Sequence, residues 1–257
     1  TSYMWLYTTG SDALTPIVLY DYQPSRKGSC AQNFLEGFRG LVQCDGYQGY
    51  NKLEDVILVC CLAHARRKFF EAVPAARRKR LKLLDINSDE AIEDINLPDE
   101  EEAKQLLPAE IGLLYCNKLF YLERTLKDLN PEERKQQRDV LEQPVWDQFW
   151  NWLDTLHPTG GSKLGKAVNY AQNHHDTLMN YLLDGRCEIS NNRAERKAKS
   201  YAIGRKAFLF HTSETGAGAS AVMYSIVETA KANNLNIFQY LYTVLLYMPD
   251  YMNSSAG

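Results

Sequence analysis

Short apolar runs separated by polar turns mark the first quarter of the chain. Two runs, residues 4–8 and 17–22, are rich in β-branched and aromatic side chains and flank a Gly-Ser-Asp segment, a pattern that predicts a β-hairpin. Two further apolar runs of strand length cover residues 41–44 and 56–62. We therefore expect four strands before residue 63.

Helical signals alternate with the later strands. A short helix is expected at residues 34–38, ended by Gly40, and a second at residues 63–72, directly after the last strand. Strand, helix, strand, helix is typical of an α/β domain.

Strand signals disappear from about residue 75 to residue 183, where helix formers dominate. Apolar residues recur there at helical spacing, and Asn130 followed by Pro131 is a strong helix start, with the Asn as N-cap. We predict helices over residues 106–129, from 131 onward, over 145–156 and over 163–181. The aromatic residues of 145–156 are expected to pack in the core. The His174-His175 pair is expected to be exposed.

The last part of the chain is expected to be helical again. A turn is predicted at residues 215–218 and an amphipathic helix at 219–231, broken by Asn233-Asn234. A final apolar helix is expected at 237–248. The chain is thus predicted to contain an N-terminal core part (1–74), an all-α insertion (75–184) and a C-terminal core part with the last helices (185–257).

Charge is strongly segregated along the chain. The formal net charge of −3 argues against a uniformly basic nucleic-acid binder. Residues 66–82 nevertheless hold eight Lys/Arg and one Glu, and residues 85–102 hold nine Asp/Glu and no Lys or Arg. Such blocks are often only solvated faces, and the acidic one is expected to be an exposed loop or weak helix. The basic blocks could still supply a local footprint for phosphates.

Six cysteines occur without the spacing of a small secreted disulfide framework. No apolar run reaches the roughly 20 residues that a bilayer span requires. We therefore expect reduced, mostly buried thiols and a cytoplasmic protein.

Asp45 follows a predicted buried strand and precedes Gly46. A carboxylate at the carboxyl end of such a strand points into the crevice where α/β sheets bind ligands. The alternative is an Asp-Gly turn with no further function, because the glycine permits a tight backbone turn.

Glu195 stands in the run Asn191-Asn192-Arg193-Ala194-Glu195-Arg196. Between residues 186 and 206 there are seven Lys/Arg and two Glu. One interpretation is a helical ion pair with Lys199, worth about 0.2–0.5 kcal/mol. The other is a metal ligand beside a polyanion, because two-metal phosphoryl transfer needs acids gathered from distant parts of the sequence and cations around them.

The segment from Cys61 to Lys68 carries a third candidate group. Cys61-x-x-His64 is half of a zinc spacing, without a second pair at a suitable distance. His64 could contact a phosphate, assist proton transfer or cap the helix. The cations that follow it are either phosphate contacts or a solvated basic turn.

Several long motifs, in order along nearly the whole chain, resemble transposases of the insertion sequence sixty-six family. They are Tyr20-Asp21-Tyr22-Gln23-Pro24-Ser25-Arg26, Cys44-Asp45-Gly46-Tyr47-Gln48-Gly49-Tyr50, residues 61–69, residues 187–196, residues 202–206 and residues 228–233.

The resemblance implies a ribonuclease-H-like core with a DDE triad and Mg²⁺- or Mn²⁺-dependent cutting and joining of DNA ends. It implies that Asp45 is the second acid, at the end of a core strand, and that Glu195 is the final acid, on a helix after the insertion. We predict DNA contacts by basic and amide residues of three of these motifs: His64, Arg66, Arg67, Lys68, Asn192, Arg193, Arg196, Arg205 and Lys206.

The family's first Asp stands in an Asp-Glu-Thr motif that we do not find in this sequence. Asp12, in a turn, and Asp21, in a motif of its own, are poor substitutes. We therefore expect the C-terminal part of a transposase, inactive alone, that binds transposon ends and target DNA, forms a homo-oligomer when intact and associates with the bacterial nucleoid. The alternatives are a catalytically inactive DNA-binding or assembly protein derived from a transposase, and a nuclease of the same fold.

Overall fold

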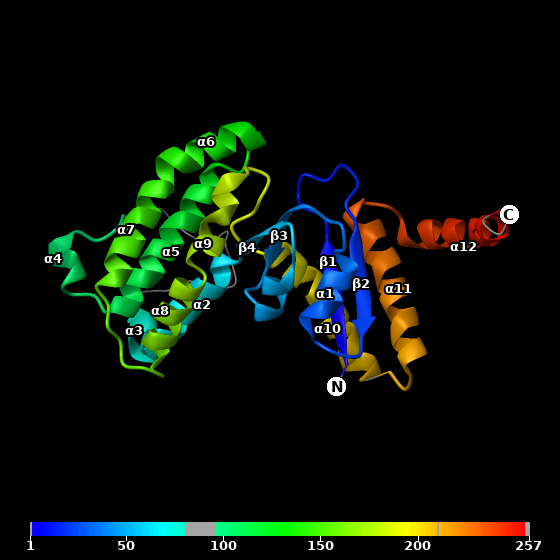
Figure 1. The fold of residues 1–257 in the computed structure, drawn as a ribbon, viewed down its shortest axis with the longest axis horizontal. Coiled ribbons are helices and arrows are strands. Elements are labelled where there is room, and N and C mark those ends of the chain that lie inside the picture. The colour runs from blue at the N-terminus through cyan, green and yellow to red at the C-terminus, as the bar shows by residue number, and fades with distance from the viewer. Residues whose placement is uncertain (1, 81–95, 210, 255–257) are drawn as a thin grey trace. The chain divides into compact units, whose positions relative to one another are not determined.

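The computed structural model of the chain describes residues 2–80, 96–209 and 211–254 and divides into two compact units (Figure 1). Unit 1 comprises Thr1–Phe34 and Asn192–Gly257, and unit 2 comprises Leu35–Asn191. Each unit contains helices and one two-stranded sheet, so the predicted mixture of strands and helices is confirmed. The ribonuclease-H-like core and the three-part division of the chain stay predictions.

Unit 1 contains the predicted hairpin. Strands β1 (Tyr3–Thr8) and β2 (Val18–Gln23) pair antiparallel, with Tyr3 opposite Gln23. Val18 and Tyr20 are buried on one face of β2, as period-two alternation requires.

The helix predicted at residues 34–38 is wrong. Helix α1 covers Gly28–Phe34 instead. Gly37, at φ 76°, has left the helical region, and both phenylalanines of the predicted segment, Phe34 and Phe38, are exposed. Their apolar character was therefore a poor guide to the helix.

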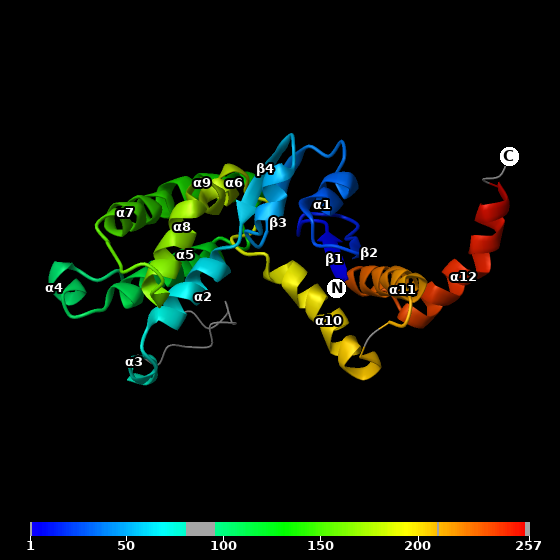
Figure 2. The same cartoon turned by 60° about the horizontal axis from the view of Figure 1, so that its bottom comes forward.

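A helix covers the outer edge of β2 in unit 1. The hydroxyl of Ser225 accepts from the backbone N–H of Tyr20 at 2.8 Å, and the hydroxyl of Thr229 accepts from that of Val18 at 3.0 Å. Asn233 donates to the carbonyl of Pro16, one step further along. Side chains four apart on a helix rise about 6 Å, close to the repeat of two strand residues. Helix α11 (Glu214–Ala232) thus takes the place of a third strand (Figure 2).

Two more helices belong to unit 1: α10 (Asn192–Phe208) and α12 (Ile237–Ser254). The turn predicted at residues 215–218 is wrong, because these residues form the first turns of α11. The side chain of Ser213 caps that helix by accepting from the N–H of Gly216, which stabilises a glycine-rich start. The predicted break at Asn233-Asn234 is confirmed, with Asn234 at φ 55°. Among the described residues, no helix is both long and apolar enough to span a bilayer.

Unit 2 begins with two parallel strands, β3 (Gly40–Cys44) and β4 (Val56–Cys60), joined through a short 3₁₀ helix, η1 (Gln48–Lys52). Helix α2 (Leu62–Ala72) follows, with Cys61 as its N-cap. The strand predicted to reach residue 62 therefore ends two residues earlier, and the predicted helix is confirmed.

The described residues of unit 2 after α2 form helices and loops without a strand, as predicted for the middle of the chain. Its helices are α3 (Ala75–Arg80), α4 (Glu100–Ala103), α5 (Pro108–Thr125), α6 (Pro131–Leu141), α7 (Gln143–Asp154), α8 (Lys163–Asn173), α9 (His175–Met179) and the 3₁₀ helix η2 (Asn180–Leu183). Asn130 caps α6 as predicted, accepting from the N–H of Glu133 at 2.9 Å.

The core of unit 2 is built on aromatic side chains. Trp146, Phe149 and Tyr181 are fully enclosed together with Phe69 of α2, so the predicted packing role of the aromatic helix is confirmed. Helix α2 packs against α5 and α8 (Figure 2). The acidic block falls largely outside the described residues; its end forms the short exposed helix α4, capped by Asp99.

Candidate nucleic-acid site

Asp45 lies at the carboxyl end of β3, where the sequence places it. One of its carboxylate oxygens accepts from the N–H of Tyr47 at 3.0 Å, and Gly46 takes φ 77°. The Asp-Gly turn is therefore real. A carboxylate offers about four lone-pair positions, so one backbone bond leaves Asp45 able to bind a cation as well.

A groove of about 630 Å³ opens beside Asp45 within unit 2. The turn after β3 contributes Gly46, Gln48 and Asn51, and α2 contributes Lys68. A side chain at Gly46 would approach the hydroxyl of Tyr170 to 2.9 Å, in addition to requiring a left-handed backbone. Glycine is thus needed for the turn and α8 to approach each other at the wall of the groove.

Helix α8 forms the other wall. Lys166, Asn169, Tyr170 and Asn173 line the groove, and His174 follows at the end of the helix. The spacing of the first four, i, i+3, i+4 and i+7, places them on one face of the helix. The hydroxyl of Tyr170 donates to the backbone carbonyl of Asp45 at 3.5 Å, and burial raises the pKa of that phenol.

Two buried thiols lie side by side, and one of them contacts His174, which lines the groove. The Sγ atoms of Cys44 and Cys60 are 3.9 Å apart, and Nδ1 of His174 lies 3.6 Å from Sγ of Cys60. The hydrogen bond with Cys44, together with the weaker effect of His174, lowers the pKa of Cys60 to about 5 against the effect of burial. The pKa of Cys44 is raised by the same hydrogen bond and by burial. The expectation that His174 is exposed is wrong: it is half-buried, with Cys60 and Tyr170 packed against it. His175 is exposed.

The predicted residues at the start of α2 have unequal surroundings. His64 lies three residues after the N-cap and is half-buried, so it is not the capping residue. Arg66 is 3% exposed; its Nε donates to Asn117 at 2.7 Å and its guanidinium lies over Phe120. Arg67 and Lys68 are half-buried, and the amine of Lys68 lies 5.0 Å from the ring centre of Tyr170. Of these side chains, Arg66 offers a phosphate the least surface.

Glu195 lies in the first turn of α10 in unit 1, where a carboxylate interacts favourably with the helix dipole. Asn192 and Arg193 are half-buried, and three predicted contacts are exposed: Arg196, Arg205 and Lys206. Asp45 belongs to unit 2 and Glu195 to unit 1, so their meeting in one metal site stays a prediction.

Lys197, the neighbour of these cations, has a different role in unit 1. Its amine bonds the carboxylate of Glu228 at 3.0 Å, and Lys231 bonds the same carboxylate at 2.7 Å. Burial disfavours the charge of Glu228, but the two lysines outweigh it and hold its pKa below the ordinary value. Lys197 therefore ties α10 to α11.

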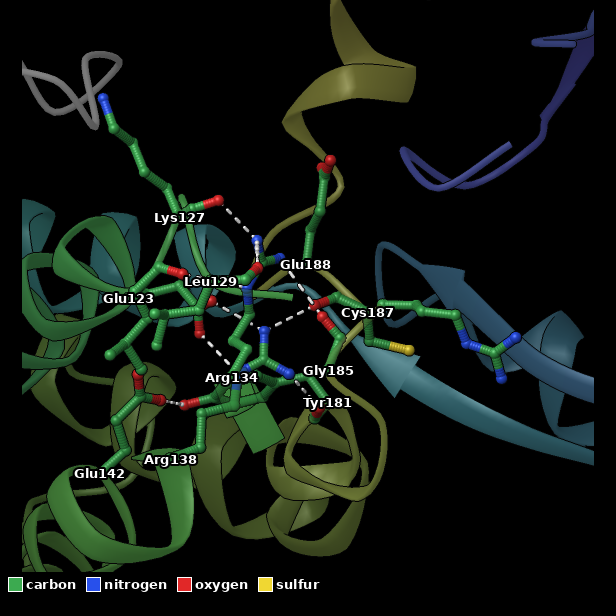
Figure 3. A network of polar contacts seen from close by, with 12 residues as sticks. Glu123, Lys127, Leu129, Arg134, Arg138, Glu142, Tyr181, Gly185, Cys187 and Glu188 are labelled. Atoms are coloured by element: carbon green, nitrogen blue, oxygen red, sulfur yellow. Dashed lines mark hydrogen bonds and ion pairs between the residues drawn. The ribbon is translucent and has the colours of Figure 1, made fainter. Parts of the chain in front are cut away.

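The segment that leads toward α10 is held by a buried arginine that the sequence analysis did not identify (Figure 3). The guanidinium of Arg138 on α6 is 0% exposed, bonds both carboxylate oxygens of Glu123 and donates to the carbonyls of Tyr181, Asp184 and Cys187. Arg134, one turn earlier, donates to the carbonyl of Gly185. The only sequence signal was the i, i+4 spacing of these arginines on a helix poor in apolar residues.

Residues 187–191 then run beside the elements that carry Asp45. The side chain of Gln43 on β3 donates to the carbonyl of Glu188, and the N–H of Leu62 donates to the carbonyl of Ile189 at 3.1 Å. The motif that contains Glu195, residues 187–196, thus has its first half packed against the strand that directly precedes Asp45.

Comparison with known proteins agrees with these motifs. A family model described as "Transposase IS66 family" matches residues 1–219. The fold class is a mixed α/β protein, and the chain belongs to this transposase family.

Curated relatives come from Sinorhizobium fredii (strain NBRC 101917 / NGR234). Uncharacterized protein y4hP is 28% identical over 246 residues, 92% of this chain and 42% of the relative. Uncharacterized protein y4jD is 30% identical over 241 residues, 90% of this chain and 42% of the relative. The chain therefore spans about two fifths of the length of the curated relatives it matches. No solved structure matches it.

Proposed function

We propose that the chain forms part of a transposase that cuts DNA at the ends of a mobile element and joins the freed 3′ ends to a target. The observation that carries the proposal is Asp45: in a chain of the transposase family, a carboxylate stands at the carboxyl end of a strand, beside a groove that carries two lysines. The packing of residues 187–191 on that strand supports the pairing of Asp45 with Glu195.

Asp45 and Glu195 would hold Mg²⁺ or Mn²⁺. The donor set fits, because these hard cations prefer carboxylate oxygens and Asp45 keeps free acceptor positions beside its single backbone bond. The bound ions would activate the attacking hydroxyl and stabilise the leaving oxygen. The family resemblance calls for a third carboxylate. We do not assign this role to Asp21, which lies on β2 in a motif of its own and accepts a hydrogen bond from the side chain of Gln23.

The basic and amide side chains would hold DNA by its backbone. We assign this role to Arg67 and Lys68 in unit 2 and to the five predicted residues of α10: Asn192, Arg193, Arg196, Arg205 and Lys206. His64 would contact a phosphate or assist proton transfer. Arg66 would instead anchor α2 through Asn117. The core parts (1–74 and 185–257), the insertion (75–184), homo-oligomerisation and association with the nucleoid belong to the same proposal.

The test uses the longest natural reading frame that contains these residues, with the element's own ends as substrate. We expect Mg²⁺-dependent cleavage and strand transfer, reduced to background by Asp45→Asn or Glu195→Gln, with metal-free DNA binding retained. Asp154→Asn, an exposed carboxylate on α7, is the matched control and should leave activity unchanged. Full activity of Glu195→Gln would overturn the assignment of Glu195 as a metal ligand. Cleavage of DNA without strand joining by the parent protein would indicate a nuclease. DNA binding without cleavage would indicate an inactive assembly protein.

A further inference from the structure

We propose that the groove of unit 2 binds one nucleotide of a DNA strand, with Lys68 and Lys166 on its phosphate and the carboxamides of α8 on its base. This inference rests on the proposed function only in taking DNA as the ligand.

The charge of the groove favours an anion. Its lining holds two lysines and, among the described residues, no Asp or Glu. Lys166 is exposed on α8, and Lys68 reaches over Tyr170 from α2. The two amines come from different elements, and together they offer a phosphate two charge-assisted hydrogen bonds.

The amide groups argue for a nucleotide over a simple phosphate ion. Gln48, Asn51, Asn169 and Asn173 are all exposed, and each carries both a donor and an acceptor. A phosphate uses only donors, whereas Asn and Gln side chains pair with the mixed donor and acceptor edges of bases. The volume of about 630 Å³ is also that of a site for an organic ligand, within the roughly 300–1,000 Å³ usual for such sites.

The position of the groove gives this nucleotide a place in the reaction. The lining begins at Gly46, directly after Asp45, and Tyr170 connects the α8 wall to the carbonyl of Asp45. A strand whose reacting phosphate lies at Asp45 would lay an adjoining, unpaired nucleotide in the groove. Recognition there would read the sequence next to the cut, a role that phosphate contacts alone cannot serve.

The test measures binding of a short, labelled single-stranded oligonucleotide to the 257-residue chain by fluorescence anisotropy, without divalent metal. We expect Lys166→Gln and Lys68→Gln each to weaken binding about fivefold at 0.1 M salt and to reduce the salt slope by about 0.7, the value for one phosphate contact on a single strand. Lys163→Gln, an exposed lysine on α8 outside the groove, is the matched control and should bind like the parent. Equal effects of Lys163→Gln and Lys166→Gln would overturn the proposal.

A competition experiment distinguishes a site that binds the base from a site that binds only phosphate. We expect deoxynucleoside monophosphates to displace the oligonucleotide at concentrations at which inorganic phosphate does not, and Asn169→Asp to change the ranking of the four nucleotides. Equal competition by phosphate would overturn the assignment of a base site. These binding assays need no DNA cleavage. Oligonucleotide binding that depends on Lys166 would therefore support the groove even if the strand-transfer assay failed. Strand transfer by a protein whose DNA binding is unchanged by Lys166→Gln would refute the groove and leave the proposed function intact.

Discussion

Replacing Arg138 by methionine tests whether the buried guanidinium holds the segment that precedes α10. Methionine keeps most of the aliphatic volume but removes the charge and the five hydrogen bonds to Glu123 and to the carbonyls of Tyr181, Asp184 and Cys187. The carboxylate of Glu123 and three carbonyls would then lose their buried donor.

The expected loss follows from that burial. Removing one partner of a buried, hydrogen-bonded ion pair costs about 3–5 kcal/mol. For a protein of this size each kcal/mol lowers Tm by roughly 2–4 °C, so we expect a fall of about 6–20 °C. Arg138→Lys should recover little, because an ammonium cannot reproduce the planar fork of donors.

Thermal and urea unfolding at pH 7 measure the loss, and hydrogen exchange locates it. Exchange should rise first at residues 181–187, whose carbonyls the guanidinium binds. Lys135→Met on the same helix removes a surface ion pair with Asp139 and should cost at most about 1 kcal/mol. A cost for Arg138→Met no larger than that of Lys135→Met, or exchange that rises evenly through unit 2, would refute the reasoning.

Two further predictions concern other buried polar groups. Glu142 is fully buried, and burial together with the charge of Glu123 holds its pKa well above the ordinary value. The folded chain therefore keeps a proton on this carboxyl group that the unfolded chain loses at lower pH. The resulting stabilisation is present at pH 4 and is lost as pH rises toward the folded-state pKa. Glu142→Gln keeps an acceptor for the hydroxyl of Tyr181, and in urea unfolding it should stabilise the chain increasingly from pH 5 to pH 8. Glu36→Gln, at an exposed position of the same unit, should show no such trend. A stability difference between Glu142→Gln and the parent that does not change with pH would contradict this prediction. Ser225→Ala should cost about 1–3 kcal/mol, because the backbone N–H of Tyr20 loses its buried acceptor. Ser220→Ala on the same helix should change stability by less than about 0.5 kcal/mol, and equal effects of the two serine variants would count against the strand-like role of α11.

Local sequence patterns predicted secondary structure correctly where the interactions that form an element lie between residues close in the sequence. The β-branched and aromatic runs predicted the hairpin, and Asn130-Pro131 predicted the start of α6. Both features join residues that are close in the sequence: the two strands are separated by a loop of nine residues, and the N-cap acts within one helical turn. The same reading failed at residues 34–38 and 215–218. Apolar or glycine-rich composition there was outweighed by backbone conformation at Gly37 and by the cap at Ser213.

The sequence by itself determined the family, the acids Asp45 and Glu195 as candidates, and the mixture of strands and helices. Only the tertiary structure showed that Arg138 is a buried clamp and Arg66 an anchor, although both stand in charged helices that suggest solvent. It also assembled the groove, whose walls come from segments about a hundred positions apart in the sequence. The physical reason is that burial and ligand sites arise from contacts between distant segments, which periodicity along one segment cannot encode.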